Sequence, residues 1–375
     1  MRIAAIGLCF LPLLVGLPAH SAAQNRGSAE SIRQSYRAQL NDNTVTIMAD
    51  MSNAMIAHDI AAVLNDGANL RVVPMIGKGP AQTVKDVMYM RGVDMGITHA
   101  TVLNHYARTG ELGPIRNQIA YVAKLFNEEM HLLAREWIDD VKQLEGKTVN
   151  MGVEGSGIEI TARHVFETLG VKVREVNVDD AEGVAKVESG AIDATILIGA
   201  KPSPLLAKVS GDSGMKLIAL PYARGLEAET YPAMLTHDDY PELIAEGEQL
   251  DTVSVCAVLV SFNWSKQHDR TKKLDRFVAR FFDNFDTLFE SPRHPKWQHV
   301  NFAAVLETWP RSPRAQAWID RAKKTVATDA SARKRFETFL AQADTGGGAA
   351  SEEERAKLFR AFVEWSKQQQ SQQSN

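Results

Sequence analysis

A glycine-serine-glycine loop, Gly155-Ser156-Gly157, lies between an apolar run and an amphipathic helix in the segment VNMGVEGSGIEITARHVFETLGV, residues 149–171. Ser156 and Glu159 have the spacing of a capping box, in which a serine hydroxyl and a glutamate carboxylate each accept a hydrogen bond from an otherwise unpaired backbone N–H. A helix that begins at the end of a strand also presents free N–H groups and the positive end of its dipole, and both attract anions. The spacing therefore predicts a capped helix start that also suits an anionic ligand.

A dinucleotide-binding turn is the main alternative for the same loop. Gly152, Gly155 and Gly157 precede a helix, and Asp179 follows at about the distance at which such folds place an acidic residue on the ribose. The glycines, however, run in the order G-x-x-G-x-G, whereas the pyrophosphate turn needs G-x-G-x-x-G. This order disfavours a nicotinamide cofactor.

Nucleophilic and metal-assisted chemistry lack their usual patterns. Ser156 is not inside a G-x-S-x-G elbow, and neither H-E-x-x-H nor a Cys/His zinc spacing occurs. His99 and His105 are six residues apart, a spacing that does not bring two side chains to one helical face. We therefore expect a protein that is not an enzyme and that carries no metal ion or cofactor.

Two lysines follow predicted strands, Lys78 in GKGPAQT and Lys201 in GAKPSPLL. The first of these segments lacks the spacing of a phosphate-binding P-loop. Each ammonium group either is solvated, as most lysines are, or faces a ligand at a strand end. The sequence leaves both interpretations open.

The composition is that of a globular protein with room for two domains, since 45% of the 375 residues are hydrophobic and 23% are charged. The net charge of −4 indicates no nucleic-acid partner. Cys256 lies in the apolar run VSVCAVLVSF, and we expect a small buried residue there rather than a nucleophile.

The first residues, MRIAAIGLCFLPLLVGLPAHSAA, combine one positive charge at Arg2, a broken apolar run and a small-residue end. This pattern predicts a secretory signal peptide of residues 1–23, cleaved after Ala23. Its removal changes the formal net charge from −4 to −5 and leaves Cys256 without a second cysteine for an intrachain disulfide. We expect a soluble periplasmic product.

An alternation of strands and helices begins after residue 43. The stretches TVTIMAD, LRVVPMI and VDMGITHA have the composition of strands, and a helical pattern follows each. Ser52 or Asn53 is placed to cap the first of these helices, and Pro80 suits the first position of the second. Such an alternation predicts an open α/β sheet whose ligand crevice lies at the carboxyl ends of the strands.

A second α/β run spans residues 136–221, and we expect the chain to return to the first lobe at about residue 222. Lobe one then comprises residues 44–135 and about 222–342, with a C-terminal part that is predicted to be helical and to have a phenylalanine-rich apolar face. Residues 343–375 are predicted to form a flexible linker, an amphipathic helix and a disordered tail.

Four segments, in order along residues 44–265, resemble a known family. They are GVDMGITHATVLNHY, MHLLAR, LEGKTVNMGVEGSGIEITARHVFETLGV and LIGAKPSPLL. They look like TAXI-type solute-binding proteins, the extracytoplasmic receptors of tripartite ATP-independent periplasmic (TRAP) transporters. The resemblance implies a type II periplasmic-binding-protein fold, in which two α/β lobes joined by hinge strands close on a small anionic solute such as an acidic amino acid or another carboxylate.

The resemblance also implies which residues contact the solute, in loops that follow strands of both lobes. The implied ligand-binding residues are Ser52, Asn53, Gly77, Lys78, Gly79, Thr98, His99, Gly155, Ser156, Gly157, Gly199, Lys201 and Pro202.

Two functions remain open. The first is a receptor that delivers its solute to TRAP membrane subunits. The second is a receptor-like interaction module that has lost its solute and contacts a membrane partner through its C-terminal helix. The second hypothesis rests on the long C-terminal tail and on the segment MADMSNAMIAHDI, which replaces a glycine-rich G-T-G-S-x-G-G-x-Y-Y-type segment. A further departure from the family is His99, which replaces a glutamine.

Overall fold

The structure is a computed structural model of the chain, and it describes residues 20–67, 69–227, 229–301 and 304–328. The chain divides into two compact units, Met1–Asn43 and Thr44–Asn375. The described part of the first unit is one helix, α1 (His20–Asn43), on which Ile32, Tyr36 and Leu40 form an exposed apolar stripe with four-residue spacing. Most of the predicted signal peptide and all of the predicted C-terminal tail lie outside the described residues.

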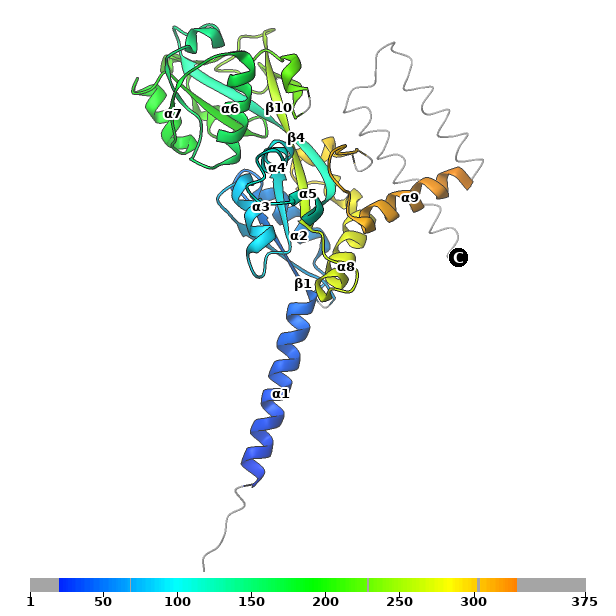
Figure 1. The fold of residues 1–375 in the computed structure, drawn as a ribbon. Coiled ribbons are helices and arrows are strands. Elements are labelled where there is room, and N and C mark those ends of the chain that lie inside the picture. Colours follow the sequence, from blue (N-terminus) through cyan, green and yellow to red (C-terminus); the bar gives the residue numbers. More distant parts are fainter. Residues whose placement is uncertain (1–19, 68, 228, 302–303, 329–375) are drawn as a thin grey trace, which may run out of the picture. The chain divides into compact units, whose positions relative to one another are not determined.

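One ten-stranded sheet runs through the second unit, and its strand order is β2-β1-β3-β10-β4-β7-β5-β6. Figure 1 labels β4 and β10, the two longest strands, at the middle of this order. Strand β8 pairs with β4, and strand β9 pairs with β10. The strands are β1 (Thr44–Ala49), β2 (Arg71–Ile76), β3 (Met95–His99), β4 (Ile119–Arg135), β5 (Thr148–Asn150), β6 (Arg174–Val176), β7 (Ala194–Gly199), β8 (Met215–Leu217), β9 (Tyr231–Thr236) and β10 (Gln249–Phe262).

Lobe one is built on the parallel strands β1, β2 and β3, and helices cover both faces of this part of the sheet. One apolar layer contains Ile47, Phe281 and Trp297, and the other contains Leu103 and Tyr106; all five side chains are buried. The helices and 3-10 turns are α2 (Ala54–Leu64), α3 (Pro80–Tyr89), α4 (Ala100–Thr109), α5 (Ile115–Gln118), α8 (Asp269–Asp283), η5 (Phe285–Phe289), η6 (Pro295–His299) and α9 (Pro313–Thr328).

Lobe two repeats this plan on a smaller scale around β5, β6 and β7. One apolar layer contains Val149 and Phe166, and the other contains Val187 and Tyr240. Its helices and 3-10 turns are η1 (Val141–Leu144), α6 (Gly157–Leu169), α7 (Asp180–Glu188), η2 (Leu206–Lys208), η3 (Gly211–Ser213) and η4 (Arg224–Leu226).

Two long antiparallel strands, β4 and β10, connect the lobes. The N-terminal part of β4 packs in lobe one through Leu125 and Phe126, whereas its C-terminal part packs in lobe two through Leu132. Both strands thus contribute to both cores, as hinge strands do. The expected two-lobe α/β fold with hinge strands is the fold of this chain.

The return to lobe one comes later in the chain than residue 222. Leu235 and Tyr240 pack in a core layer of lobe two, and Val253 at the start of the apolar run of β10 does so as well. Ala257, further along the same strand, packs in lobe one. We therefore place the return within β10, and residues 222–255 belong with lobe two because strand β9 pairs only with the lobe-two half of β10.

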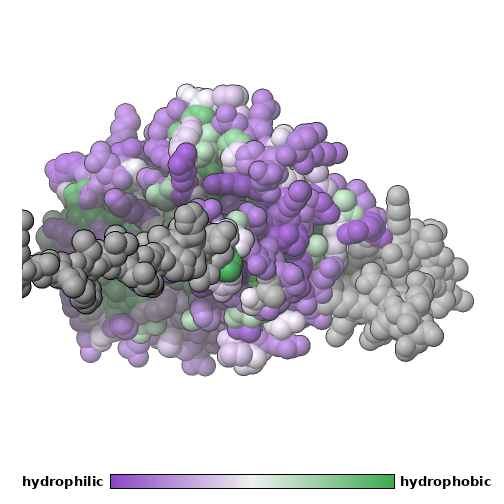
Figure 2. Space-filling view, turned by 90° about the horizontal axis from the view of Figure 1, so that it is seen from below, coloured by the Kyte–Doolittle hydropathy of each residue, from purple (hydrophilic) through white to green (hydrophobic). Residues whose placement is uncertain are grey.

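The predicted helical C-terminal part is confirmed for α8 and α9, with 3-10 turns and irregular chain between them. The face of α8 that carries Phe277, Phe281 and Phe282 is buried against the sheet, as its spacing predicts. Cys256 is fully buried in β10. Hydrophilic side chains cover most of the surface visible in Figure 2. Over the described ranges, no helix is both long and apolar enough to cross a membrane.

Candidate functional site

Loops from the two lobes meet where the parallel strands end, and we call this region the junction. A Cβ atom built on Gly157, at the start of α6, would lie 2.9 Å from the Cβ of Pro80, at the start of α3. The hydroxyl oxygens of Thr101 on α4 and Thr161 on α6 are 2.9 Å apart. The two lobes are therefore in direct contact in this structure.

A network of hydrogen bonds, buried at Asn53, His99 and Glu128, joins three predicted residues of lobe one. His99 Nε2 lies 2.5 Å from Glu128 Oε2, and Asn53 Nδ2 donates to Glu128 Oε1 at 3.0 Å. The Ser52 hydroxyl and the Asn53 backbone N–H both donate to Asp50 Oδ1, each at 2.9 Å. Glu128 in β4 thus ties the loop after β1 to the end of β3.

Two atoms of this network are buried and have no hydrogen-bond partner within the described chain. They are Asn53 Oδ1 and His99 Nδ1, on residues that are 1% and 2% exposed. Burial of an unpaired polar atom costs on the order of 1–3 kcal/mol. Such atoms are uncommon in folded proteins, and a bound group that pairs with them would remove the cost.

Two carboxyl groups from different lobes interact at the junction. Burial raises the pKa of Asp50, and the neighbouring carboxylate of Glu128 adds to the effect. Burial also raises the pKa of Asp180, at the start of α7, to about 6, with repulsion from Asp179 and Asp50 as further causes. Because Asp50 belongs to lobe one and Asp180 to lobe two, the junction concentrates negative charge from both sides.

A buried ion pair lies beside this network. Trp297 in η6 is fully buried and donates its indole N–H to Asp59 of α2 at 3.0 Å, which fixes η6 on lobe one. Lys296, the residue before it, reaches Glu129 of β4 at 2.7 and 2.8 Å and also donates to the Asn127 carbonyl. Burial raises the pKa of Glu129, and the ammonium group of Lys296 opposes that rise.

The capping box at α6 is confirmed. Ser156 Oγ accepts from the Glu159 N–H at 3.1 Å, and Glu159 Oε2 accepts from the Gly155 N–H at 2.5 Å. Asn177 holds the same carboxyl group in place by donating to Glu159 Oε1 at 3.0 Å. The helix ends at Gly170, which adopts the left-handed conformation typical of glycine at a helix end.

Of the other predicted residues of lobe one, three hold the backbone in place at the strand ends and one lies at the surface. The Thr98 hydroxyl donates to the Pro80 carbonyl at 2.8 Å and is fully buried, so it holds the start of α3. The Gly77 N–H donates to the Ala49 carbonyl at 2.7 Å, which joins the ends of β1 and β2. Gly79 precedes α3 with a φ of 132°, a conformation that side chains disfavour. Lys78, between them, is exposed.

The predicted residues of lobe two after β7 also reach the junction. A Cβ atom built on Gly199 would lie 4.0 Å from Ser52 Cβ of lobe one. The Lys201 N–H donates to Glu129 Oε2 at 3.3 Å, but its ammonium group turns away and pairs with Asp239 at 2.9 Å. The peptide bond between Lys201 and Pro202 is cis. Lys201 therefore donates its backbone N–H at the junction, while its ammonium group acts on Glu129 only through space.

An ion pair at the edge of the junction also links the lobes. Arg108 of α4 lies 2.6 Å from Glu229 of lobe two, and His164 of α6 lies 4.0 Å from the same carboxylate. Arg108 is half-exposed, so the pair contributes at most about 1 kcal/mol.

Five charged residues of the junction were not among the predicted site residues: Asp50, Glu128, Glu129, Asp180 and Lys296. The adjacent glutamates at 128 and 129 carried a signal, because they interrupt an apolar strand in which almost every residue is buried. Lys296 carried none, since it lies 167 residues from the carboxylate it pairs with. Within the described parts of the chain, no group of three or more His, Cys, Asp or Glu side chains is placed to hold a metal ion.

Comparison with solved structures finds distant similarities. The periplasmic binding protein BugD is 12% identical, with a TM-score of 0.44 over 74% of this chain and 93% of its own. A structure described as a periplasmic transporter is 13% identical, with a TM-score of 0.43 over 88% and 97%. The alkanesulfonate-binding protein SsuA from Xanthomonas axonopodis pv. citri, bound to MOPS, is 12% identical, with a TM-score of 0.41 over 68% and 76%.

A family comparison covers most of the two lobes, but not strand β1 or Asp50, Asn53 and Lys296 of the junction. The sequence model of the NMT1-like family matches residues 54–264, which is more than half of the 375 residues. The matched stretch begins at the first residue of α2 and ends two residues after β10. This chain therefore belongs to the NMT1-like family.

Proposed function

We propose that this protein is an extracytoplasmic solute-binding receptor of the TAXI type, which captures a small carboxylate or amino acid between its lobes and delivers it to TRAP-type membrane subunits. One observation carries the proposal: loops at the strand ends of both lobes converge on a polar junction that contains buried unpaired atoms of Asn53 and His99. A receptor in which hinge strands allow the lobes to open would use such a junction to enclose a solute.

The start of α6 supplies the groups that suit a carboxylate. The capping box uses the N–H groups of Gly155 and Glu159. It leaves those of Gly157 and Ile158, which as first-turn amides have no partner inside the helix. A carboxylate there would accept charge-assisted hydrogen bonds and would benefit from the helix dipole.

The carboxyl groups of the junction favour an amino acid within the proposed solute class. Asp50 lies close enough to Asp180 to contribute to the raised pKa of Asp180, and Glu128 contributes to the raised pKa of Asp50. A solute that carries only negative charge would be repelled by them. An ammonium group on the solute would instead be attracted, so a zwitterion fits both sides of the junction.

Secretion is part of the proposal. Residues 1–23 have the pattern of a signal peptide, and a receptor that works with a membrane transporter in the periplasm needs one.

A thermal-shift screen with acidic amino acids, dicarboxylates and their ammonium-free analogues tests the proposal. A solute at 100 times its Kd adds about 2.7 kcal/mol to the free energy of unfolding, which raises Tm by several degrees. Asn53→Ala should abolish the shift. Asn65→Ala, at the other end of α2, should keep it. No shift with any solute of the panel would refute the proposal.

A solute-free interaction module is the second candidate, and one observation favours it. Three side chains that could bind an anionic solute already contact carboxylates of the protein. They belong to His99, Lys201 and Lys296. A pull-down from membrane extracts with and without residues 351–375 separates the two functions. A receptor tolerates this deletion, whereas the module loses its partner.

A further inference from the structure

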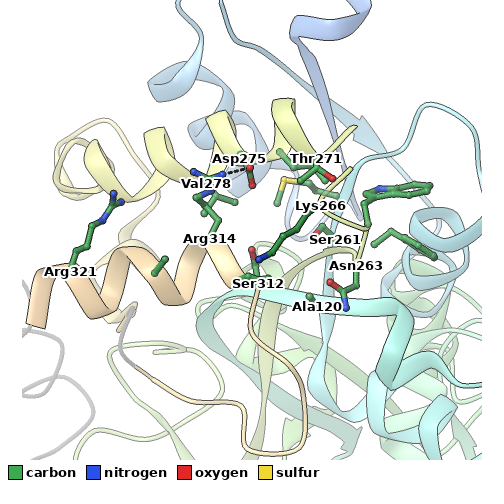
Figure 3. Close-up of a pocket in the computed structure, with 16 residues that line it drawn as sticks. Ala120, Ser261, Asn263, Lys266, Thr271, Asp275, Val278, Ser312, Arg314 and Arg321 are labelled. Atoms are coloured by element: carbon green, nitrogen blue, oxygen red, sulfur yellow. Dashed lines mark hydrogen bonds and ion pairs between the residues drawn. The ribbon is translucent and has the colours of Figure 1, made fainter. Parts of the chain in front are cut away.

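A cavity of about 500 Å³ lies in lobe one, away from the junction (Figure 3). Met95, at its wall, begins strand β3, whereas His99 of the junction ends it. Four residue-to-residue steps along the strand separate the two by about 13 Å. The cavity and the junction are therefore at opposite ends of the same strand.

The walls of the cavity come from the sheet, α8 and α9, and a large part of them is apolar. Figure 3 shows α8 and α9 on one side of the space and the ends of the sheet strands on the other. The apolar lining residues are Met95, Ala120, Phe262, Trp264, Leu274, Val278, Pro313 and Ala317.

The charged residues at the cavity are mostly cationic. Lys266, Arg314 and Arg321 line it together with one carboxylate, Asp275, which forms an ion pair with Arg314. The side chain of Lys266 extends across the cavity towards Ser312 (Figure 3). The lining thus carries three cationic side chains and one carboxylate, whereas the whole chain has a net charge of −4.

Most of this lining lies outside the part of the chain that matches the NMT1-like family. The match ends at residue 264, whereas Lys266 and the contributions of α8 and α9 come after it. The cavity is therefore built where the C-terminal helices of this chain fold back on the sheet of lobe one.

We propose that this cavity binds a small amphipathic monoanion, a carboxylate or sulfonate on an aromatic or aliphatic body. The volume falls in the range of about 300–1,000 Å³ that small-molecule sites occupy, and such sites combine an apolar lining with a few polar groups that orient the ligand. The body of the ligand packs against Phe262, Leu274 and Val278. Its charged group lies at the cationic rim, where Lys266 and Arg314 supply N–H donors.

The test uses the fluorescent sulfonate 1-anilinonaphthalene-8-sulfonate on the full-length protein, with octanoate and octylammonium as competitors. We expect stoichiometric binding of the probe and displacement by octanoate but not by octylammonium. The cation is excluded because it would add to the positive charge already at the rim. Equal displacement by both competitors would contradict the proposal.

Two pairs of variants locate the site. Lys266→Ala should weaken the binding of the probe and of octanoate by at least about five-fold, since it removes one charge-assisted contact. The control is Lys272→Ala, because Lys272 is an exposed residue of α8 outside the cavity, and this variant should bind both compounds like the parent. Ala317→Trp, which fills the cavity from an exposed position on α9, should abolish binding, and Gln316→Trp on the same helix should not.

Both tryptophan variants must retain the circular dichroism and Tm of the parent, so that loss of binding reports on the cavity. Unchanged binding in Ala317→Trp places the probe elsewhere and overturns the proposal. Solutes that bind at the junction should not displace the probe, so this site and the proposed receptor function succeed or fail independently.

Discussion

Asp180 shows how single residues make the junction sensitive to pH. Its folded-state pKa of about 6 exceeds the value of about 3.9 for an aspartate in an unfolded chain. Between these values the folded protein holds a proton that the unfolded chain has released. The contribution of Asp180 to the free energy of unfolding therefore falls as the pH rises from about 4 to about 6.

Asp180→Asn should remove this pH dependence. We expect the free energy of unfolding of the variant, relative to that of the parent, to be higher at pH 7.5 than at pH 4 by on the order of 1 kcal/mol. This value is discounted for the partial exposure of the side chain. Urea unfolding at the two pH values measures it. Asp238→Asn, on an exposed residue, is the control. An equal difference at both pH values would show that Asp180 is not held in its protonated form.

Lys296 should be far more costly to remove than a surface lysine. Lys296→Met leaves the Glu129 carboxylate buried without its partner, and we expect a loss of about 3–5 kcal/mol at neutral pH. The double variant with Glu129→Gln should recover much of this loss because no charge is then buried. Urea unfolding of the single and double variants measures the pair. A loss below about 1 kcal/mol in the single variant would mean that water reaches Glu129.

The elements show which parts of the fold the sequence encodes locally. The capped start of α6 at Ser156 and the first position of α3 at Pro80 were both predicted correctly, because each depends only on residues close in the sequence. Strand β9 and the first half of β4 were not predicted. Their place depends on pairing with β10, more than 100 residues after the start of β4.

The residues of the junction also differ in whether local sequence patterns could predict them. Ser52, Asn53 and His99 could be predicted as neighbours because they follow parallel strands of one sheet. Asp50 holds Ser52 and Asn53 from two and three residues away, so its contacts are local. The contact of Glu128 with Asn53 required the register of β4 against β10 and β7, which no local pattern gives. The return of the chain to lobe one was placed too early for the same reason: β9 pairs within lobe two, and the crossing lies inside a continuous strand.

Helix α6 fits against lobe one only because its first residue is glycine. Gly157→Ala would bring a Cβ atom to 2.9 Å from Pro80 and 3.2 Å from Val102, closer than carbon atoms normally approach. Since Pro80 is rigid, we expect the lobes to separate, with a larger radius of gyration in small-angle X-ray scattering and no large loss of Tm. Glu154→Ala, on an exposed neighbour, is the control. An unchanged radius of gyration would mean that the contact relaxes within α3 and α6.

The whole molecule is a pair of α/β lobes that share one sheet and meet over a junction. Within the described chain, the contacts across this junction include the Thr101 and Thr161 hydroxyls, Gly157 against Pro80, Ile160 of α6 against a core layer of lobe one, and the Arg108 pair with Glu229. None of them is a large apolar surface. Strands β4 and β10 are therefore the main connection between the lobes, and an opening motion about them costs little packing energy.

A reversible covalent lock across the junction is the most direct test of solute capture between the lobes. The Thr101 and Thr161 oxygens are 2.9 Å apart, so Thr101→Cys with Thr161→Cys places two thiols within reach of a disulfide, while Cys256 is buried. Calorimetric titration uses the solute that gives the largest thermal shift. We predict that the reduced variant binds this solute like the parent, and that the oxidised variant, locked closed while empty, does not bind it. Equal binding by the oxidised and reduced forms would contradict capture between the lobes.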